Sequence, residues 1–431
     1  MVNGIRVSGV DAFEILDSRS RPTLQVSVQT ADGRTATAGV PAGASTGKLE
    51  AVELRDGDQK RYNGQGVLKA VASVTGEIAQ LLAGKEWANQ AEIDAALIEL
   101  DGTENKSRLG ANAIIGVSMA FARLFAGDTP LWKHLIVPAA VPRLPVPHFN
   151  VLNGGAHAAN NLDFQEFMIA PIGAPSMAEA VRAGSEVYAA LKKLLVSKGH
   201  VVGLGDEGGF APQIDLPEDA LDLLVQAIED AGYVTGLDGV AIAIDPAASQ
   251  FQQSDGSYLI AGQRHSNEDL VARYVELVRD YPLWSIEDGM AEDDYEGFKL
   301  LYAELGEHIQ IMGDDVFVTN PKLIAQGASE GWANSSLIKL NQIGTVTETL
   351  QALQTCRDNG MTAQISHRSG ETPDDFIADL TVACGSGQLK SGAPARGERV
   401  AKYNRLIAIA RQDPSLPYGL PESALSGIHT G

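Results

Sequence analysis

Cysteine is scarce in this sequence. Only Cys356 and Cys384 occur, and no Cys-x-x-Cys spacing is present, so neither a disulfide framework nor a structural zinc site is indicated. Because thiols stay reduced in the cytoplasm, this composition favours a cytoplasmic location. The sequence also has no long apolar run, and its start, MVNGIRVSGVDAF, lacks a basic segment followed by an apolar one. We therefore expect neither a membrane span nor an export signal.

Basic residues are also in short supply. The 431 residues include 33 Lys and Arg against 55 Asp and Glu, which gives a formal net charge of -22. A protein that binds nucleic acid or an anionic membrane needs a basic face, so neither is an expected partner. If so acidic a chain acts on a negatively charged substrate, the local sign must be reversed, and bound divalent cations are the simplest way to do so.

The composition is that of a globular protein. Hydrophobic residues make up 44% and charged residues 20% of the chain, which excludes a disordered chain. Alternating Leu24, Val26 and Val28, followed by helical spacing over 67–78 and 114–124, predicts an α+β unit. A proline-rich passage at 138–147 then interrupts all periodicity. We place an N-terminal α+β domain at residues 1–137 and a second domain at 141–431.

In the second domain, short apolar strands each end in an ionisable residue, and a helical stretch follows each of them. The strand ends are Asp245, Glu287, Asp314, Lys339 and the pair His367 and Arg368. Strands alternating with helices predict parallel βα units, and the carboxyl ends of strands in a βα barrel meet at one mouth. The sequence therefore predicts an α/β fold with a TIM-like βα barrel that gathers these side chains in one place.

The residue types at these strand ends suggest a chemistry. Asp245, Glu287 and Asp314 offer the hard oxygen ligands that Mg²⁺ prefers, although acids at strand ends can also simply cap the next helix. Lys339 lies in the apolar segment SSLIKLNQIG, where a lysine is costly without a purpose. As a general base it must be neutral, which burial and neighbouring cations favour. The alternative is an ordinary buried ion pair with one of the acids.

Glycine-rich segments and histidines leave further interpretations open. Residues 43–47 read GASTG, a literal G-x-S-x-G, so a serine hydrolase is one hypothesis. That motif belongs at the end of a core strand of a large sheet, however, and here it lies in the small first domain. A mobile loop carrying hydroxyls at Ser45 and Thr46 is the favoured interpretation. His157 follows a glycine pair, and SHRSG at 366–370 offers groups suited to a phosphate, or forms a plain turn.

Together the motifs resemble the enolase family along nearly the whole chain. They are GASTG at 43–47, ELRDGD at 53–58, LGANAIIGVS at 109–118, QEFMIAP at 165–171, GDEGGFAP at 205–212, SIED at 285–288, GDD at 313–315, VTNP at 318–321, KLNQIGT at 339–345, SHRSGET at 366–372 and GAPAR at 392–396. The resemblance implies a capping α+β domain, an atypical barrel, and a homo-oligomer, either a dimer or an octamer. It also implies a cytoplasmic lyase, in some bacteria found at the cell surface too, that reversibly dehydrates 2-phospho-D-glycerate to phosphoenolpyruvate with two Mg²⁺.

Carried over motif by motif, the resemblance assigns a role to each candidate residue. Asp245, Glu287 and Asp314 look like ligands of the first Mg²⁺, and Ser45 like a loop ligand of the second. Lys339 looks like the base that removes the C2 proton, while Glu207, with Glu166 beside it, looks like the acid for the departing 3-hydroxyl. The residues that resemble substrate contacts are His157 (also counted as catalytic), His367, Arg368 and Ser369 on the phosphate side, and Gln165 and Lys390 on the carboxylate side.

Several positions depart from the common family pattern. Ser20 and Arg21 replace a Gly-Asn pair, Ala42 replaces a serine before the loop, and His148-Phe149 replaces a Met-Met pair; Gly289-Met290 stands where proline is usual. These changes leave open an enolase-like paralogue of the carboxyphosphonoenolpyruvate synthase type, from phosphonate-antibiotic biosynthesis. A non-catalytic scaffold is a third hypothesis, which the complete set of charged residues disfavours.

Overall fold

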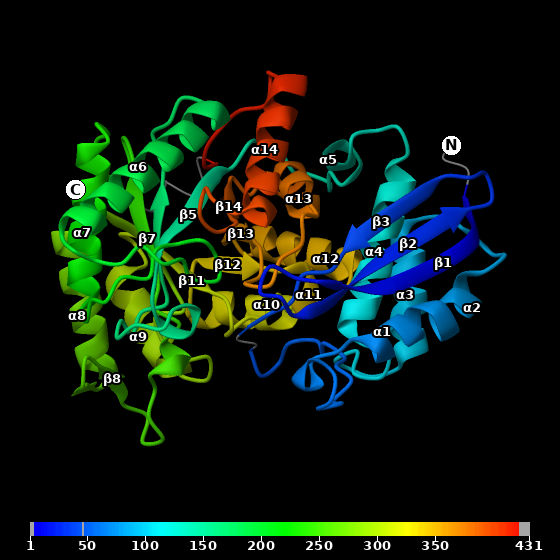
Figure 1. Ribbon diagram of the computed structural model, residues 1–431, viewed down its shortest axis with the longest axis horizontal. Helices are drawn as coiled ribbons and strands as arrows, with labels where there is room; N and C mark the ends of the chain where they lie inside the picture. The colour runs from blue at the N-terminus through cyan, green and yellow to red at the C-terminus, as the bar shows by residue number, and fades with distance from the viewer. Residues whose placement is uncertain (1–3, 45–46, 422–431) are drawn as a thin grey trace.

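The computed structural model describes residues 4–44 and 47–421, which form a small α+β part beside a large barrel (Figure 1). The small part has a four-stranded sheet in the order β3-β2-β1-β4. Its strands are β1 (Ile5–Leu16), β2 (Pro22–Thr30), β3 (Thr35–Gly39) and β4 (Glu86–Trp87), and its helices are α1 (Leu68–Ser73), α2 (Ala79–Leu82), α3 (Gln90–Asp101), α4 (Ala111–Ala126) and α5 (Leu131–His134). The predicted α+β unit is therefore confirmed.

Helix α4 holds the small part together because nearly all of its residues are buried. It packs on β2 and β3, and the alternating Leu24, Val26 and Val28 of β2 are fully buried. The close approach depends on Gly116, since a Cβ there would lie 2.5 Å from the side chain of Val26. A bulkier residue would force the helix away from the sheet.

The large part is a closed barrel of eight strands, which confirms the predicted TIM-like fold. The strands are β5 (Val146–Asn153), β6 (Glu166–Ala170), β7 (Ala241–Asp245), β10 (Leu283–Glu287), β11 (Gln310–Gly313), β12 (Ser335–Ile338), β13 (Thr362–Ser366) and β14 (Gln388–Lys390). Helices α8 (Asn267–Asp280), α9 (Tyr295–Leu305), α10 (Pro321–Glu330), α12 (Val346–Asp358), α13 (Phe376–Cys384) and α14 (Gly397–Gln412) surround it, and a two-stranded hairpin of β8 (Tyr258–Ile260) and β9 (Gln263–His265) follows β7 (Figure 1).

One strand of the barrel runs the opposite way. Strand β6 pairs antiparallel with both β5 and β7, whereas the other barrel pairs are parallel. Because β6 ends at the far end of the barrel, the chain crosses the outside twice, on α6 (Met177–Ser197) and α7 (Pro217–Asp230), before β7 begins. The β5–β6 loop and the α6–α7 loop consequently both reach the mouth.

Below the mouth, one side of the barrel interior is apolar. Val146, Met168, Ala170, Ala241, Ala243 and Trp284 form a buried cluster of their own. Since Met168 and Ala243 lie two residues from Glu166 and Asp245 on their strands, the strand alternation places charged residues at the rim and apolar ones beneath. Among the described residues, no helix combines the length and apolarity that a bilayer crossing requires.

The domain boundary predicted near Val141 lies between α5, which ends at His134, and β5, which begins at Val146. That boundary stays a prediction.

Candidate active site

The ionisable residues predicted at strand ends gather at the barrel mouth. A polar cavity there is lined by His157, Gln165, Glu166, Glu207, Asp245, Ala247, Asp288, Asp314, Asp315, Lys339, Ser366, His367, Arg368, Ser369 and Lys390. Glu287 lies immediately beside this set, since its carboxylate contacts Lys390. The structure thus brings together every described candidate of the sequence analysis. Ser45 lies outside the described residues.

Lys390 lies at the centre of the acidic cluster. Its Nζ is 3.0 Å from Glu166 Oε2, 3.2 Å from Asp245 Oδ2 and 2.9 Å from Glu287 Oε2. Burial opposes the charge on this lysine, but the surrounding carboxylates outweigh burial and raise the pKa of Lys390 well above its usual value. Burial and the charge of Asp245 raise the pKa of Glu287. Carboxylate oxygens from three strands therefore already converge on one buried cation.

Lys339 and Asp314 form a second charged pair, from the ends of β12 and β11. The lysine Nζ donates to Asp314 Oδ2, while Gln342 Nε2 donates to Asp314 Oδ1 at 2.8 Å. Burial lowers the pKa of Lys339, but the Asp314 carboxylate more than offsets this, so the pKa is raised. The neutral lysine expected from the sequence is thus not the form that this pairing favours, because Asp314 acts as its counter-ion.

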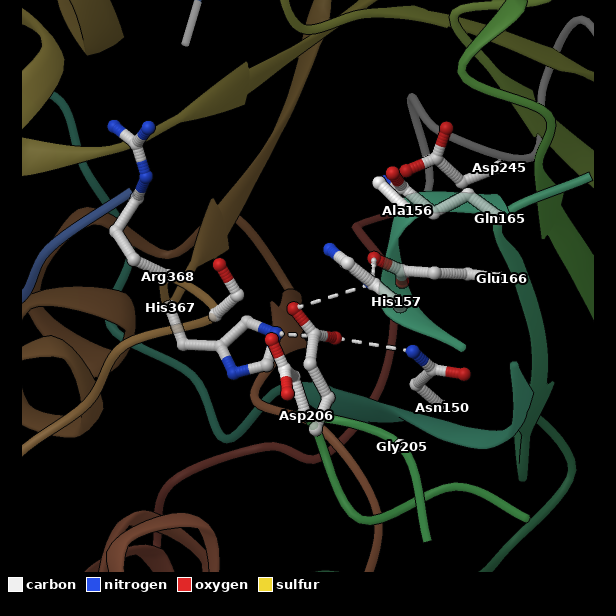
Figure 2. Close-up of polar contacts among 12 residues, drawn as sticks. Asn150, Ala156, His157, Gln165, Glu166, Gly205, Asp206, Asp245, His367 and Arg368 are labelled. Carbon is white, nitrogen blue, oxygen red and sulfur yellow. Dashed lines mark hydrogen bonds and ion pairs between the residues drawn. The ribbon is translucent and has the colours of Figure 1, made fainter. Parts of the chain in front are cut away.

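Opposite this pair, two glutamates and two histidines face one another. Glu207 Oε2 accepts a hydrogen bond from Asn150 Nδ2 at 3.0 Å and lies 3.1 Å from His367 Nε2. His157 Nδ1 lies 3.5 Å from Glu166 Oε1 and 3.8 Å from Glu207 Oε1. Figure 2 shows Asn150, His157, Glu166 and His367 around this shared space.

The pKa values of the two glutamates are shifted in opposite directions. Burial and the nearby charge of Glu207 raise the pKa of Glu166 well above its usual value. Burial also disfavours the charge on Glu207, but His367 and His157 outweigh it and lower the pKa of that carboxyl. Arg399 Nη1 lies 2.6 Å from His367 Nδ1, and since arginine only donates, the neutral ring carries its proton on Nε2, toward Glu207. The raised pKa favours the protonated form of Glu166, and the lowered pKa favours the carboxylate form of Glu207.

Arg368 closes the cavity on the side of the small domain. It contacts Glu50, 318 residues away in the sequence, at 2.9 Å and 3.1 Å. Ser369 Oγ accepts a hydrogen bond from Arg19 Nη1 at 3.1 Å. Gln165 Oε1 accepts from Gln250, whose own Oε1 accepts from the backbone of Ala156 at 3.0 Å.

The small domain reaches the mouth through backbone contacts as well. Ala42, at a departure from the common family pattern, forms an antiparallel bridge with Gly370. Its N–H donates to Gly370 O at 2.7 Å, and Gly370 N–H donates back at 2.9 Å. The G-x-S-x-G match begins at Gly43, directly after Ala42 of this bridge, and the strand before it is β3 of the small domain, not a core strand of the barrel. A nucleophile elbow needs that strand, so the hydrolase hypothesis has no support from the fold.

Sequence reasoning missed several residues that hold the site. Glu50, Asn150 and Gln342 contact Arg368, Glu207 and Asp314, respectively. Asp288 accepts hydrogen bonds from the backbone N–H groups of Asp314 and Asp315 at 2.8 Å and 2.9 Å. Asn150 alone had a local signal, because it is a polar residue inside the apolar strand β5. The others are recognisable only from contacts between distant segments.

A closed βα barrel with buried acids, lysines and histidines at its carboxyl-terminal mouth defines a TIM-barrel enzyme suited to metal-assisted acid–base chemistry. Two family profiles match the chain: "Enolase, C-terminal TIM barrel domain" over residues 142–415 and "Enolase, N-terminal domain" over residues 7–135. The chain is 56% identical over 407 residues to the enolase of Rubrobacter xylanophilus and 54% identical over 405 residues to that of Beutenbergia cavernae. In each comparison 94% of both chains is covered.

The chain belongs to the enolase family, and it is a lyase. The predicted resemblance is confirmed, and the match over nearly the full length favours the enolase activity over the paralogue and the scaffold.

Proposed function

We propose that residues on two sides of this cavity carry out the base and acid steps of the reaction of the family. The protein catalyses the reversible dehydration of 2-phospho-D-glycerate to phosphoenolpyruvate, a step of glycolysis. The observation that carries the proposal is the arrangement of Lys339 and the pair Glu166 and Glu207 around one cavity. Dehydration requires a base for the C2 proton and an acid for the 3-hydroxyl, and both must reach the same small substrate.

Enolases use Mg²⁺, and the residues present fit a magnesium site. Asp245, Glu287 and Asp314 supply buried, hard oxygen ligands, and two of them already share the ammonium of Lys390. We propose these three as ligands of one Mg²⁺ and Ser45 as a ligand of a second. Bound Mg²⁺ supplies positive charge that stabilises the negative charge developing on the substrate carboxylate.

On the base side, Lys339 removes the proton from C2. Its pairing with Asp314 holds the amine in place but also keeps it protonated. If Asp314 coordinated a bound Mg²⁺ instead, its carboxylate would no longer act as the counter-ion of Lys339, and burial would then lower the pKa of the lysine. The lysine can then accept a proton. The electron pair of the broken C2–H bond is first delocalised into the substrate carboxylate, and it forms the C2=C3 double bond when the C3–O bond breaks.

On the acid side, the C3–O bond breaks and the hydroxyl leaves as water with a proton from the Glu207 side. The raised pKa of Glu166 favours its protonated form, and the lowered pKa of Glu207 favours its carboxylate form. The nearest ligand atoms of Glu166, Glu207 and His157 lie within 4.8 Å of one another, so Glu166 can supply Glu207. We assign Arg368, Ser369 and His157, which line the cavity, to the substrate phosphate, and His367, 3.1 Å from Glu207 Oε2, to orienting Glu207. Gln165 and Lys390 lie where a carboxylate can bind.

The substrate is a small phosphorylated carboxylate. We propose a homo-oligomer, a dimer or an octamer, in the cytoplasm. Size-exclusion chromatography with light scattering checks the oligomer.

The formation of phosphoenolpyruvate from 2-phosphoglycerate, followed by absorbance, tests the proposal. Wild-type protein with Mg²⁺ should turn over, and EDTA should abolish the activity until excess Mg²⁺ restores it. A serine-directed inhibitor should have no effect. Activity that survives EDTA and disappears with that inhibitor would overturn the proposal in favour of hydrolase chemistry.

A further inference from the structure

Glu50 is a buried acid that the reaction scheme above does not use, and it connects the small domain to the cavity. Its Oε2 accepts a hydrogen bond from Arg368 Nη1 at 2.9 Å, and its Oε1 accepts from Arg368 Nη2 at 3.1 Å. The same Oε1 accepts from the backbone N–H of Gly47 at 3.0 Å and from Gln342 Nε2 at 3.4 Å. One carboxylate therefore joins the residue that ends the GASTG segment to two residues of the barrel.

The contacts extend from Glu50 to the proposed reacting groups. Gln342 Nε2 also donates to Asp314 Oδ1 at 2.8 Å, and Gln342 Oε1 accepts from Thr319 Oγ1 at 2.6 Å. Thr319 Oγ1 in turn accepts from the backbone N–H of Lys339 at 2.9 Å. The phosphate-side arginine, a proposed metal ligand and the proposed base are thus linked through one network that starts in the small domain.

Other ion pairs between the two domains lie outside the cavity. Lys106 pairs with Glu348 at 2.9 Å, and Arg123 pairs with Asp374 at 2.7 Å. None of these four residues lines the cavity, whereas Arg368 does. Docking of the small domain alone therefore does not require an acid at Glu50. The two-pronged contact fixes the plane of the Arg368 guanidinium, which a single contact leaves free to rotate.

We infer that Glu50 is a positioning residue of the small domain, which aims Arg368 at the substrate phosphate and ties the segment ending at Gly47 to the barrel. The inference rests on the proposed function for the role of Arg368. The position has an electrostatic cost, because the negative charge of Glu50 opposes the phosphate that Arg368 attracts. Glu50 therefore weakens ground-state attraction while it improves alignment, and the two effects separate in kinetics.

The test compares Glu50→Gln with the matched control Glu348→Gln, which breaks a partly buried interdomain pair away from the cavity. Each variant removes a carboxylate that pairs with a buried cation, so both should lower the Tm. Glu50→Gln should reduce kcat at least tenfold while KM stays the same or falls. Glu348→Gln should keep kcat and KM within twofold of wild type. An unchanged kcat in Glu50→Gln, or a rise in KM alone, would overturn the inference.

Two further measurements keep the inference distinct from the reaction assignment. A crystal structure of Glu50→Gln should show the Arg368 guanidinium rotated from its wild-type position, whatever the enzyme turns over; an unmoved guanidinium overturns the inference. If wild-type protein does not convert 2-phosphoglycerate, the proposed function fails, and the crystal structure still decides the position of Arg368. If Glu50→Gln does not fold, Glu50→Asp keeps the charge but withdraws it by one methylene, and it should lower kcat at least threefold with KM within twofold.

Discussion

The two sides of the cavity are built from different kinds of chain. Asp314 and Lys339 come from consecutive regular βα units, and each follows the end of its strand directly. Glu166, His157 and Glu207 come from the reversed strand β6, the β5–β6 loop and the α6–α7 loop. The regular side pairs opposite charges, whereas the reversed side crowds two acids and sets their pKa values apart. Reversing one strand thus lets the barrel place a pair of acids at its mouth, beside the charged pair from the regular βα units.

The largest effect should come from removing Lys339, the proposed base on the regular side. Lys339→Ala should lower kcat by about 10⁴-fold, at the upper end for a general base. Because the lysine is buried with Asp314, its loss leaves that carboxylate unpaired, so circular dichroism must establish that the variant is folded. The measurement is phosphoenolpyruvate formation at saturating Mg²⁺. Turnover within tenfold of wild type would assign the base elsewhere.

On the reversed side, Glu207→Gln should lower kcat by about 10³-fold. The amide keeps the size of the side chain but cannot carry the proton between Glu166 and the leaving hydroxyl. Exchange of the substrate C2 proton with deuterated water, followed by NMR, should continue in this variant and stop in Lys339→Ala. Equal loss of exchange in both variants would contradict the division of the cavity into two sides.

Residues beneath the rim of the barrel should affect the stability of the protein and not its turnover. Met168→Ala should lower the free energy of unfolding by about 2–5 kcal/mol, because it opens a cavity inside the apolar cluster. The kcat should remain within twofold of wild type, since Met168 does not line the active-site cavity. Urea unfolding monitored by tryptophan fluorescence measures the free energy of unfolding. A stable but inactive Met168→Ala protein would show that rim and interior are not separable.

A smaller and pH-dependent effect is expected from His148. Burial lowers the pKa of this ring from 6.5 to about 3. Between these pH values His148 is protonated in the unfolded chain but neutral in the folded protein. The stability contribution is complete above pH 6.5 and falls by about 1.4 kcal/mol per pH unit below it. His148→Met should flatten the dependence of unfolding free energy on pH between pH 6 and 4 by that slope. An unchanged slope would mean that His148 does not titrate in this way.

The site residues on the regular side could be predicted from the sequence for a physical reason. Asp245, Glu287, Asp314 and Lys339 each follow a short apolar strand, and the βα repeat alone places strand ends at one mouth. Glu166 stands at the start of its strand, and Glu207 lies on a loop between two helices. Residue spacing cannot locate either, so they were found only through the family resemblance. Glu50 was not found, because its contact with Arg368 exists only once two domains have docked.

The pairing of Lys390 with three carboxylates has a consequence for how the enzyme is assembled. The ammonium group contacts Glu166 and acts as an internal counter-ion for Asp245 and Glu287, so these buried carboxylates have a positive partner without a divalent ion. Folding of the barrel would then not depend on metal binding. If Asp245 and Glu287 bind Mg²⁺ as proposed, the ion would replace the ammonium group of Lys390 as their positive partner, and Lys390 would then be available to the substrate carboxylate.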